Sequence, residues 1–311
     1  MTRRVLITGA SGFIGKALVT ALAKQGYAIR AAARDPAHII AASDVERVAI
    51  PDLVGSLDWS PLLTDVTHVV HLAGIAHAPG TLPDDVYMQI NAEAVGTLAK
   101  QAKGRVERLV LMSSVRAQAG LSAEAPITEA DTPEPTDTYG RSKLEAERLL
   151  AASDVGYTVL RPAVVYGKGV KGNIAALATI AKTPMPLPFG GLDNKRSLLA
   201  LENLASAITH VLEAPQAENE TYLVADASPI SVADLVSAMR EGLGRPPHLV
   251  KVPQGAVKKL MKSFGREADW ERVSGPFVID VSKLLATGWT PTVETHDGIV
   301  RMMRAESGAA A

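Results

Sequence analysis

The feature that most constrains the fold is a glycine-rich turn close to the N-terminus, Gly9-Ala-Ser-Gly-Phe-Ile-Gly15. It follows an apolar run at residues 5–8 that is typical of a buried strand, and it opens a segment with apolar residues at helical spacing. Glycines let the backbone approach a pyrophosphate closely, and a helix N-terminus supplies free N–H groups and a positive dipole. The turn therefore predicts a dinucleotide site; the alternative interpretation is a tight turn without a ligand.

Strand-like and helix-like segments alternate through the first half of the chain. The expected strands lie at residues 5–8, 28–32, 47–50, 68–72, 109–112 and 157–160, and the expected helices at 13–25, 84–103 and 140–152. A further helix is expected at 202–212 and a short strand at 221–224. Such alternation predicts an α/β fold with a doubly wound parallel sheet, the Rossmann arrangement.

The domain organisation follows from a change of composition after Gly167, where glycine and proline crowd together up to Gly191. We expect residues 1–166, with about 197–225, to form the dinucleotide-binding domain. We expect about 167–196 and 226–305 to form a smaller, interleaved C-terminal substrate lobe, and 306–311 to form a tail.

Composition excludes several classes of protein. The 311 residues are 47% hydrophobic, enough for a sizeable core, and 32 basic against 33 acidic residues give no bulk basicity for nucleic acid. No apolar stretch reaches the roughly 18 residues of a membrane span. The absence of cysteine excludes disulfides and thiolate metal sites. We therefore expect a cytoplasmic protein with no metal, no nucleic-acid partner and no membrane partner.

Two further motifs carry candidate chemistry. Tyr139 and Lys143 are four residues apart, so they share a helix face, and an ammonium beside a phenol lowers the tyrosine pKa from about 10 toward neutrality. Such a tyrosine can exchange a proton with a substrate oxygen, although a plain surface helix would show the same spacing. Ser113 and Ser114 end a predicted strand, where a hydroxyl either hydrogen-bonds within the turn or holds a substrate carbonyl.

Taken together, the motifs resemble the extended short-chain dehydrogenases/reductases of the NAD-dependent epimerase/dehydratase family over nearly the whole chain. The matching segments are Thr8-Gly-Ala-Ser-Gly-Phe-Ile-Gly15, His71-Leu-Ala-Gly74, Asn91 with Thr97, Ser113-Ser114, Tyr139-x-x-x-Lys143, Arg161-Pro-Ala-Val-Val-Tyr-Gly167 and Gly288-Trp-Thr-Pro291. The resemblance implies that Tyr139 is the acid/base and that Lys143 also holds the nicotinamide ribose. It favours Ser114 as the catalytic hydroxyl. Ser113 stays possible, because the family's usual Val-Tyr-Gly is here replaced by Arg116-Ala-Gln-Ala119.

The same resemblance assigns binding residues. Those expected at the cofactor, besides Tyr139 and Lys143, are Gly9, Ser11, Gly12, Phe13, Ile14, Gly15, Arg34, Asp52, Leu53, Leu72, Ala73, Gly74 and Pro162. At the substrate we expect Ser114, Asn173, Arg196 and Arg272. Arginine suits a diphosphate because its planar fork meets phosphate oxygens bidentately. Either arginine can instead be an ordinary surface residue, and Asn173 a plain helix N-cap.

A narrower resemblance is to bacterial UDP-sugar 4-ketoreductases, through residues 165–173, 186–190 and 192–203. It implies reduction of a UDP-linked 4-keto-6-deoxy-N-acetylhexosamine in surface-polysaccharide synthesis, by a homodimer. At the end of the second strand an acidic residue would bind the adenosine ribose and repel a 2′-phosphate, but Ala33 and Arg34 stand there. NADP(H) is thus compatible with the site, whereas Asp35, one or two positions later, would favour NAD(H) if the strand ended there. The alternatives are a UDP-hexose 4-epimerase with tightly bound NAD⁺, a reductase of small ketones and a non-catalytic NADP(H) sensor.

Overall fold

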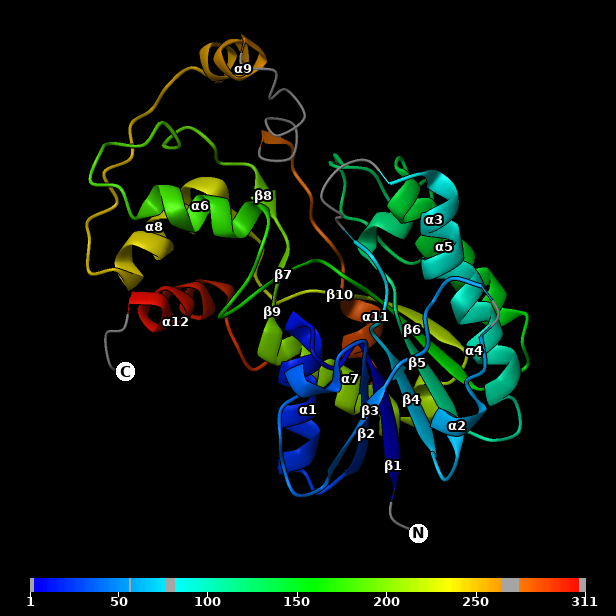
Figure 1. The fold of residues 1–311 in the computed structure, drawn as a ribbon. Coiled ribbons are helices and arrows are strands. Elements are labelled where there is room, and N and C mark those ends of the chain that lie inside the picture. Colours follow the sequence, from blue (N-terminus) through cyan, green and yellow to red (C-terminus); the bar gives the residue numbers. More distant parts are fainter. Residues whose placement is uncertain (1–2, 56, 77–81, 264–273, 308–311) are drawn as a thin grey trace.

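A seven-stranded parallel sheet forms the centre of the molecule (Figure 1). The structure is a computed structural model, and it describes residues 3–55, 57–76, 82–263 and 274–307. The strand order is β3-β2-β1-β4-β5-β6-β10. The strands are β1 (Arg4–Thr8), β2 (Ala28–Ala33), β3 (Val45–Ala49), β4 (His68–His71), β5 (Arg108–Met112), β6 (Tyr157–Pro162) and β10 (Glu220–Val224). All neighbouring pairs are parallel, which confirms the doubly wound α/β fold.

Helices cover both faces of the sheet because successive strand residues point to opposite sides. Val5 and Ile7 of β1 lie in one core with α1 (Phe13–Lys24) and α7 (Leu201–Glu213), whereas Leu6 lies in a second core. The second core is covered by α2 (Ser60–Leu63), α4 (Ala94–Ala102) and α5 (Thr138–Ala151). The expected helices 13–25, 140–152 and 202–212 are confirmed to within two residues.

The stretch 84–103, expected as one helix, is helical from Asp84 to Ala102 and contains one turn of π-helix. α3 (Asp84–Met88) and α4 are separated by η2 (Gln89–Glu93), a turn of π-helix. A wide turn of this kind often accompanies a functional position, and here it contains the buried Asn91. The expected span is therefore confirmed at both ends, and the π-turn within it is the difference.

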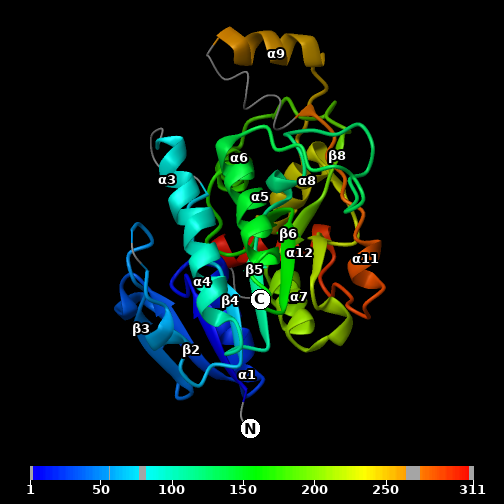
Figure 2. The same cartoon turned by 90° about the vertical axis from the view of Figure 1, so that its right-hand side faces the viewer.

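A third hydrophobic core lies beyond the sheet and is built from α6 (Asn173–Ala181), α8 (Val232–Gly242) and α12 (Thr295–Ser307). Two small sheets flank it: β7 (Val164–Tyr166) with β9 (Leu198–Ala200), and β8 (Lys195–Arg196) with β11 (Ile230–Ser231). α9 (Gln254–Ser263) stands apart from the other elements in both views (Figures 1 and 2). The remaining short helices are η1 (Pro36–His38), η3 (Val115–Ala117), η4 (Pro215–Ala217) and α11 (Ser282–Leu285).

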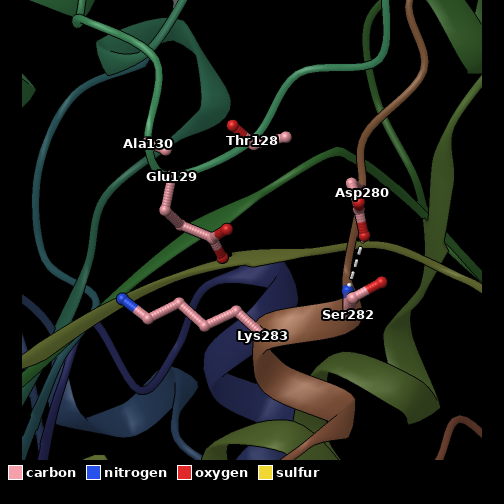
Figure 3. Close-up of a pocket in the computed structure, with 6 residues that line it drawn as sticks. All are labelled: Thr128, Glu129, Ala130, Asp280, Ser282 and Lys283. Atoms are coloured by element: carbon pink, nitrogen blue, oxygen red, sulfur yellow. Dashed lines mark hydrogen bonds between the residues drawn. The ribbon is translucent and has the colours of Figure 1, made fainter.

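The outer edge of the sheet, at β10, is closed by side chains rather than by another strand. Glu129 accepts a hydrogen bond from the Leu223 N–H at 2.7 Å, and Lys283 donates to the Thr221 carbonyl at 2.9 Å. Both side chains line a pocket of about 420 Å³ between the loop at residues 128–130 and the start of α11 (Figure 3). These contacts satisfy edge groups that would otherwise be open to another strand. Among the described residues, no helix is both long and apolar enough to cross a membrane.

Candidate active site

The glycine-rich turn lies where the strand order reverses, between β1 and β4, which is where open α/β sheets bind ligands. Gly9 has φ +69°, and a Cβ there would lie 2.9 Å from the Ala73 nitrogen. A Cβ on Gly15 would lie 2.3 Å from the Gly9 carbonyl oxygen, so this glycine is required by the packing of α1 on the turn. No side chain caps α1 at Gly12. Ser11, Phe13 and Ile14 lie in this turn and the first turn of the helix, and the geometry fits the phosphates of a dinucleotide.

At the carboxyl end of β2 the residue that directly follows the strand is a cation, Arg34. Ala33 is buried and Arg34 is exposed. Asp35 bonds within its own turn: one oxygen accepts from the Ala37 N–H at 2.9 Å and the other lies 2.9 Å from Nδ1 of His38. Arg34 is therefore the charged side chain next to the end of β2, and the carboxylate of Asp35 caps the N-terminus of η1.

The segment after β4 is anchored to β1. The Thr8 hydroxyl accepts hydrogen bonds from the N–H groups of Leu72 and Ala73, at 3.2 Å each.

Asp52 and Leu53, which are expected at the adenine, follow β3. Asp52 is exposed and accepts a hydrogen bond from the Val54 N–H, whereas Leu53 packs against the second core.

Asn91 holds the segment that follows β4, at Gly74 and Ile75, next to Lys143. Its amide oxygen accepts from the Ile75 N–H at 2.9 Å, and its nitrogen donates to the hydroxyl of Ser142 at 3.0 Å. A Cβ on Gly74 would lie 2.7 Å from that amide oxygen and 3.6 Å from Lys143 Nζ. The resemblance to the family includes Asn91 but assigns it no role. The structure shows that its side chain joins the segment after β4 to α5.

Tyr139, Lys143 and Ser114 come together from α5 and the end of β5. Asp137 caps α5 by accepting from the Gly140 N–H at 2.7 Å. A hydrogen bond joins the hydroxyls of Ser114 and Tyr139, and Ser114 Oγ also accepts from the Arg116 N–H at 3.1 Å. The structure thus places a serine hydroxyl against the tyrosine.

The expected depression of the tyrosine pKa is not found. Burial raises the pKa of Tyr139 to about 12, and the hydrogen bond with Ser114 opposes this only in part. Lys143 is aimed elsewhere, because its ammonium donates to the Met112 carbonyl at 2.9 Å. Burial lowers the pKa of Lys143 to about 8, and the carboxylate of Glu147 opposes that shift. The phenol is therefore protonated at neutral pH, as a proton donor must be.

Ser113 belongs to a buried network instead of the tyrosine. Its hydroxyl donates to Glu147, and the Arg161 guanidinium binds the same carboxylate, with Nε 3.0 Å from Oε1. The side chains of Glu147 and Arg161 are only 8% and 7% exposed. Arg161 also donates to the amide oxygen of Gln118, one of the residues that replace the family's Val-Tyr-Gly. This geometry favours Ser114 over Ser113 as the hydroxyl that faces a substrate.

Glu147 and Gln118 were missed by sequence reasoning. Glu147 follows Lys143 by four residues, which places both on one face of α5, and that spacing was the available signal. Gln118 gave no signal, because its partner Arg161 is on β6, 43 residues away.

The residues expected at the substrate are only partly brought together. Arg196 is on β8, and its guanidinium donates to the backbone carbonyls of Gly275 and Leu121. Burial, and next the neighbouring charge of Arg116, lower the pKa of Arg196 to about 10. Asn173 is the exposed first residue of α6, and Gly172, not Asn173, occupies the N-cap position. Arg272 lies outside the described residues, and Pro162 is buried at the end of β6.

Comparisons with known proteins agree with this geometry. The model of the NAD-dependent epimerase/dehydratase family matches residues 5–225. A UDP-glucose 4-epimerase of Vibrio cholerae is 33% identical over 98% of this chain and 96% of its own length. A GDP-6-deoxy-D-mannose reductase of Pseudomonas aeruginosa is 30% identical over 94% of this chain and 93% of its own. The solved structure of MoeE5 with UDP-glucuronic acid and NAD is 25% identical, with a TM-score of 0.77, over 99% of this chain and 100% of that protein.

Proposed function

This chain belongs to the NAD-dependent epimerase/dehydratase family, and from that premise we propose that it reduces the 4-keto group of a UDP-linked 6-deoxy-N-acetylhexosamine with NADPH or NADH. At the coarser level it is an enzyme of the epimerase/reductase type that acts on UDP-sugars and uses NAD(P). Beyond this, we propose that the net reaction is a reduction and that the sugar is a 6-deoxy-N-acetylhexosamine.

The observation that carries the proposal is the end of β2. A net reductase must exchange its cofactor at every turnover, whereas an epimerase recycles one tightly held NAD⁺. Arg34 is exposed beside the position of the adenosine ribose, and the carboxylate of Asp35 is engaged in its own turn. An arginine there attracts a 2′-phosphate, and the nearest carboxylate, that of Asp35, is bonded within its own turn. NADPH is the cofactor of choice for a reductive step.

The proposed mechanism assigns one role to each of the three polar groups. The nicotinamide cofactor supplies the hydride that reaches C4 of the sugar. Tyr139, protonated at neutral pH, donates its proton to the oxygen that was the carbonyl, and the Ser114 hydroxyl holds that oxygen in place. Lys143 supplies positive charge beside the site and a donor for the nicotinamide ribose. A non-catalytic sensor would have no need of the bonded Ser114–Tyr139 pair.

A second candidate is 4-epimerisation of a UDP-hexose, because the V. cholerae relative that is 33% identical is named a UDP-glucose 4-epimerase. The same residues would serve it, with Tyr139 first taking and then returning a proton. Within the proposal we also infer a homodimer that joins through α4 and α5 of each subunit, by analogy with the family. A chain without cysteine suits the reducing cytoplasm, where we place the reaction.

The two candidates differ in what the purified protein carries. We expect protein denatured after gel filtration to release much less than one nucleotide per chain, and NADPH to bind reversibly in a fluorescence titration. Stoichiometric NAD⁺ that survives gel filtration would contradict the reductase and support the epimerase.

A further inference from the structure

Arg116 stands in the segment where this chain departs from the family's Val-Tyr-Gly, and the proposed mechanism gives it no role. It lies in η3, and its backbone N–H donates to Ser114 Oγ at 3.1 Å. A Cβ on Gly140 would clash with the carbonyl oxygen of Arg116. The backbone of Arg116 is therefore packed directly against the first turn of α5, beside the hydroxyl that is bonded to Tyr139.

The side chain of Arg116 is bonded to the residues at which α5 begins. Its Nη2 donates to the Thr136 hydroxyl at 3.1 Å and to Asp137 Oδ2 at 2.7 Å. The other oxygen of Asp137 accepts from the Gly140 N–H at 2.7 Å, so this carboxylate is both the cap of the helix and the partner of the arginine. The Arg116 side chain is 17% exposed, and its Nη1 is buried with no hydrogen-bond partner within the described part of the chain.

The groups around Tyr139 act on its phenol in opposite directions. Burial is the main cause of its raised pKa, and the hydrogen bond with Ser114 lowers that pKa. The carboxylate of Asp137 raises the pKa further, as does Tyr87 of α3, whereas the guanidinium of Arg116 lowers it. Arg116 thus offsets the negative charge that the cap of α5 brings close to the phenol.

Asp137 carries that negative charge at neutral pH. Burial acts to raise its pKa, but the hydrogen bonds from Arg116 and from the Gly140 N–H outweigh burial and hold the pKa below its usual range. The charge of Arg141 acts in the same direction, although Arg141 is 46% exposed and also pairs with Asp84 at 3.4 Å. Without Arg116, the carboxylate would therefore be opposed mainly by an exposed, solvent-screened cation.

We propose that Arg116 is a positioning residue of the active site, which holds the Ser114 hydroxyl and neutralises the carboxylate of Asp137. Tyr139 becomes a phenolate when it gives its proton to the sugar oxygen, and an unpaired carboxylate nearby would oppose that new charge. Lys143 is on the same helix, but its ammonium donates to a backbone carbonyl at 2.9 Å. This role of Arg116 rests on the proposed function of Tyr139 as the proton donor, and it serves reduction and epimerisation alike.

The test follows the ionisation of residue 139 directly. In the full chain Tyr139 is replaced by difluorotyrosine, which titrates well below ordinary tyrosine, and the absorbance of its phenolate is measured against pH. Arg116→Met should raise this pKa by about half a pH unit or more, because Asp137 loses its counter-charge. Asp137→Asn, which keeps a good helix cap, should lower the pKa, and the double variant should return close to the parent.

Two further variants are the controls. Arg116→Lys keeps the positive charge and should titrate as the parent does. Arg148→Met removes one positive charge from an exposed pair with Glu145, in the last turn of α5, and should also leave the titration unchanged. Thermal unfolding at the pH of the titration checks that every variant is folded.

An unchanged titration in Arg116→Met, or a shift that Asp137→Asn does not reverse, would overturn the proposal. The measured quantity is the pKa of one phenol, so the result is independent of turnover. A shifted titration in a protein that reduces no 4-keto sugar supports the role of Arg116 and refutes the proposed function. Normal reduction by a protein whose titration ignores Arg116 refutes the role of Arg116 alone.

Discussion

Neutralising the buried carboxylate of Glu147, one helical turn from Lys143, should destabilise the enzyme strongly. Glu147→Gln keeps the shape and an acceptor for Ser113, but it leaves the Arg161 guanidinium, whose side chain is 7% exposed, without a counter-charge. Removing one partner of a buried ion pair costs about 3–5 kcal/mol. For a chain of 311 residues, an unfolding entropy of about 2.1 cal/mol/K per residue converts this cost into a fall in Tm of roughly 5–8 °C.

The chain offers a matched control on the same helix. Glu145 pairs with Arg148 at 3.4 Å, but the two side chains are 40% and 68% exposed. Because an exposed pair of this kind contributes about 0.5 kcal/mol or less, Glu145→Gln should leave Tm nearly unchanged. Thermal unfolding followed by circular dichroism, with urea titrations, measures both variants.

The same variant should change the pH dependence of the reaction. The pKa of Lys143 is about 8, lowered by burial and held up by the charge of Glu147. Lys143 acts as a cation, so activity falls as pH rises through its pKa. Without the charge of Glu147 that pKa is lower, and the fall begins at a lower pH. A Glu147→Gln enzyme as stable as Glu145→Gln, or one with the parent's pH profile, would refute the role of the network.

Three other predictions concern the site. Tyr139→Phe should fold and bind cofactor in a fluorescence titration yet lose about 10²–10⁴-fold in kcat, as expected when a general acid is removed; near-normal turnover would exclude Tyr139 as the proton donor. Ser114→Ala should lower kcat about 10²-fold, whereas Ser113→Ala should mainly lower Tm, and steady-state rates beside thermal melts would expose a reversed assignment. Arg34→Asp should shift the NADPH-to-NADH ratio of kcat/KM toward NADH by roughly tenfold or more; an unchanged ratio would show that Arg34 does not contact the 2′-phosphate.

The sheet was predictable because each central strand is a short apolar run bounded by turn residues, and the Gly9–Gly15 segment gave its starting point. The small pairs β7 with β9 and β8 with β11 were not predicted. Strands of two or three residues have too few positions to show a periodicity. The π-turn at Asn91 was not predicted, because a single wider turn leaves the helical spacing of apolar residues on either side intact.

Some residues of the candidate site were likewise indicated by the sequence, and others were not. Local spacing singled out Tyr139, Lys143 and Ser114; the structure joins Ser114 to Tyr139, whereas the ammonium of Lys143 donates to the Met112 carbonyl. The contacts of Arg161 with Gln118 and Glu147 join three separate elements, so no local pattern shows them. The pKa of Tyr139 is raised mainly by burial, which helical spacing does not reveal, and Lys143 bonds to the Met112 carbonyl instead.

The most direct test of the central claim is to mix the enzyme with a UDP-linked 4-keto-6-deoxy-N-acetylhexosamine and follow the absorbance of NADPH and of NADH separately. The account predicts consumption of one reduced cofactor per sugar, with a higher kcat/KM for NADPH. No consumption of either cofactor, together with interconversion of UDP-glucose and UDP-galactose without added nucleotide, would contradict it and identify an epimerase.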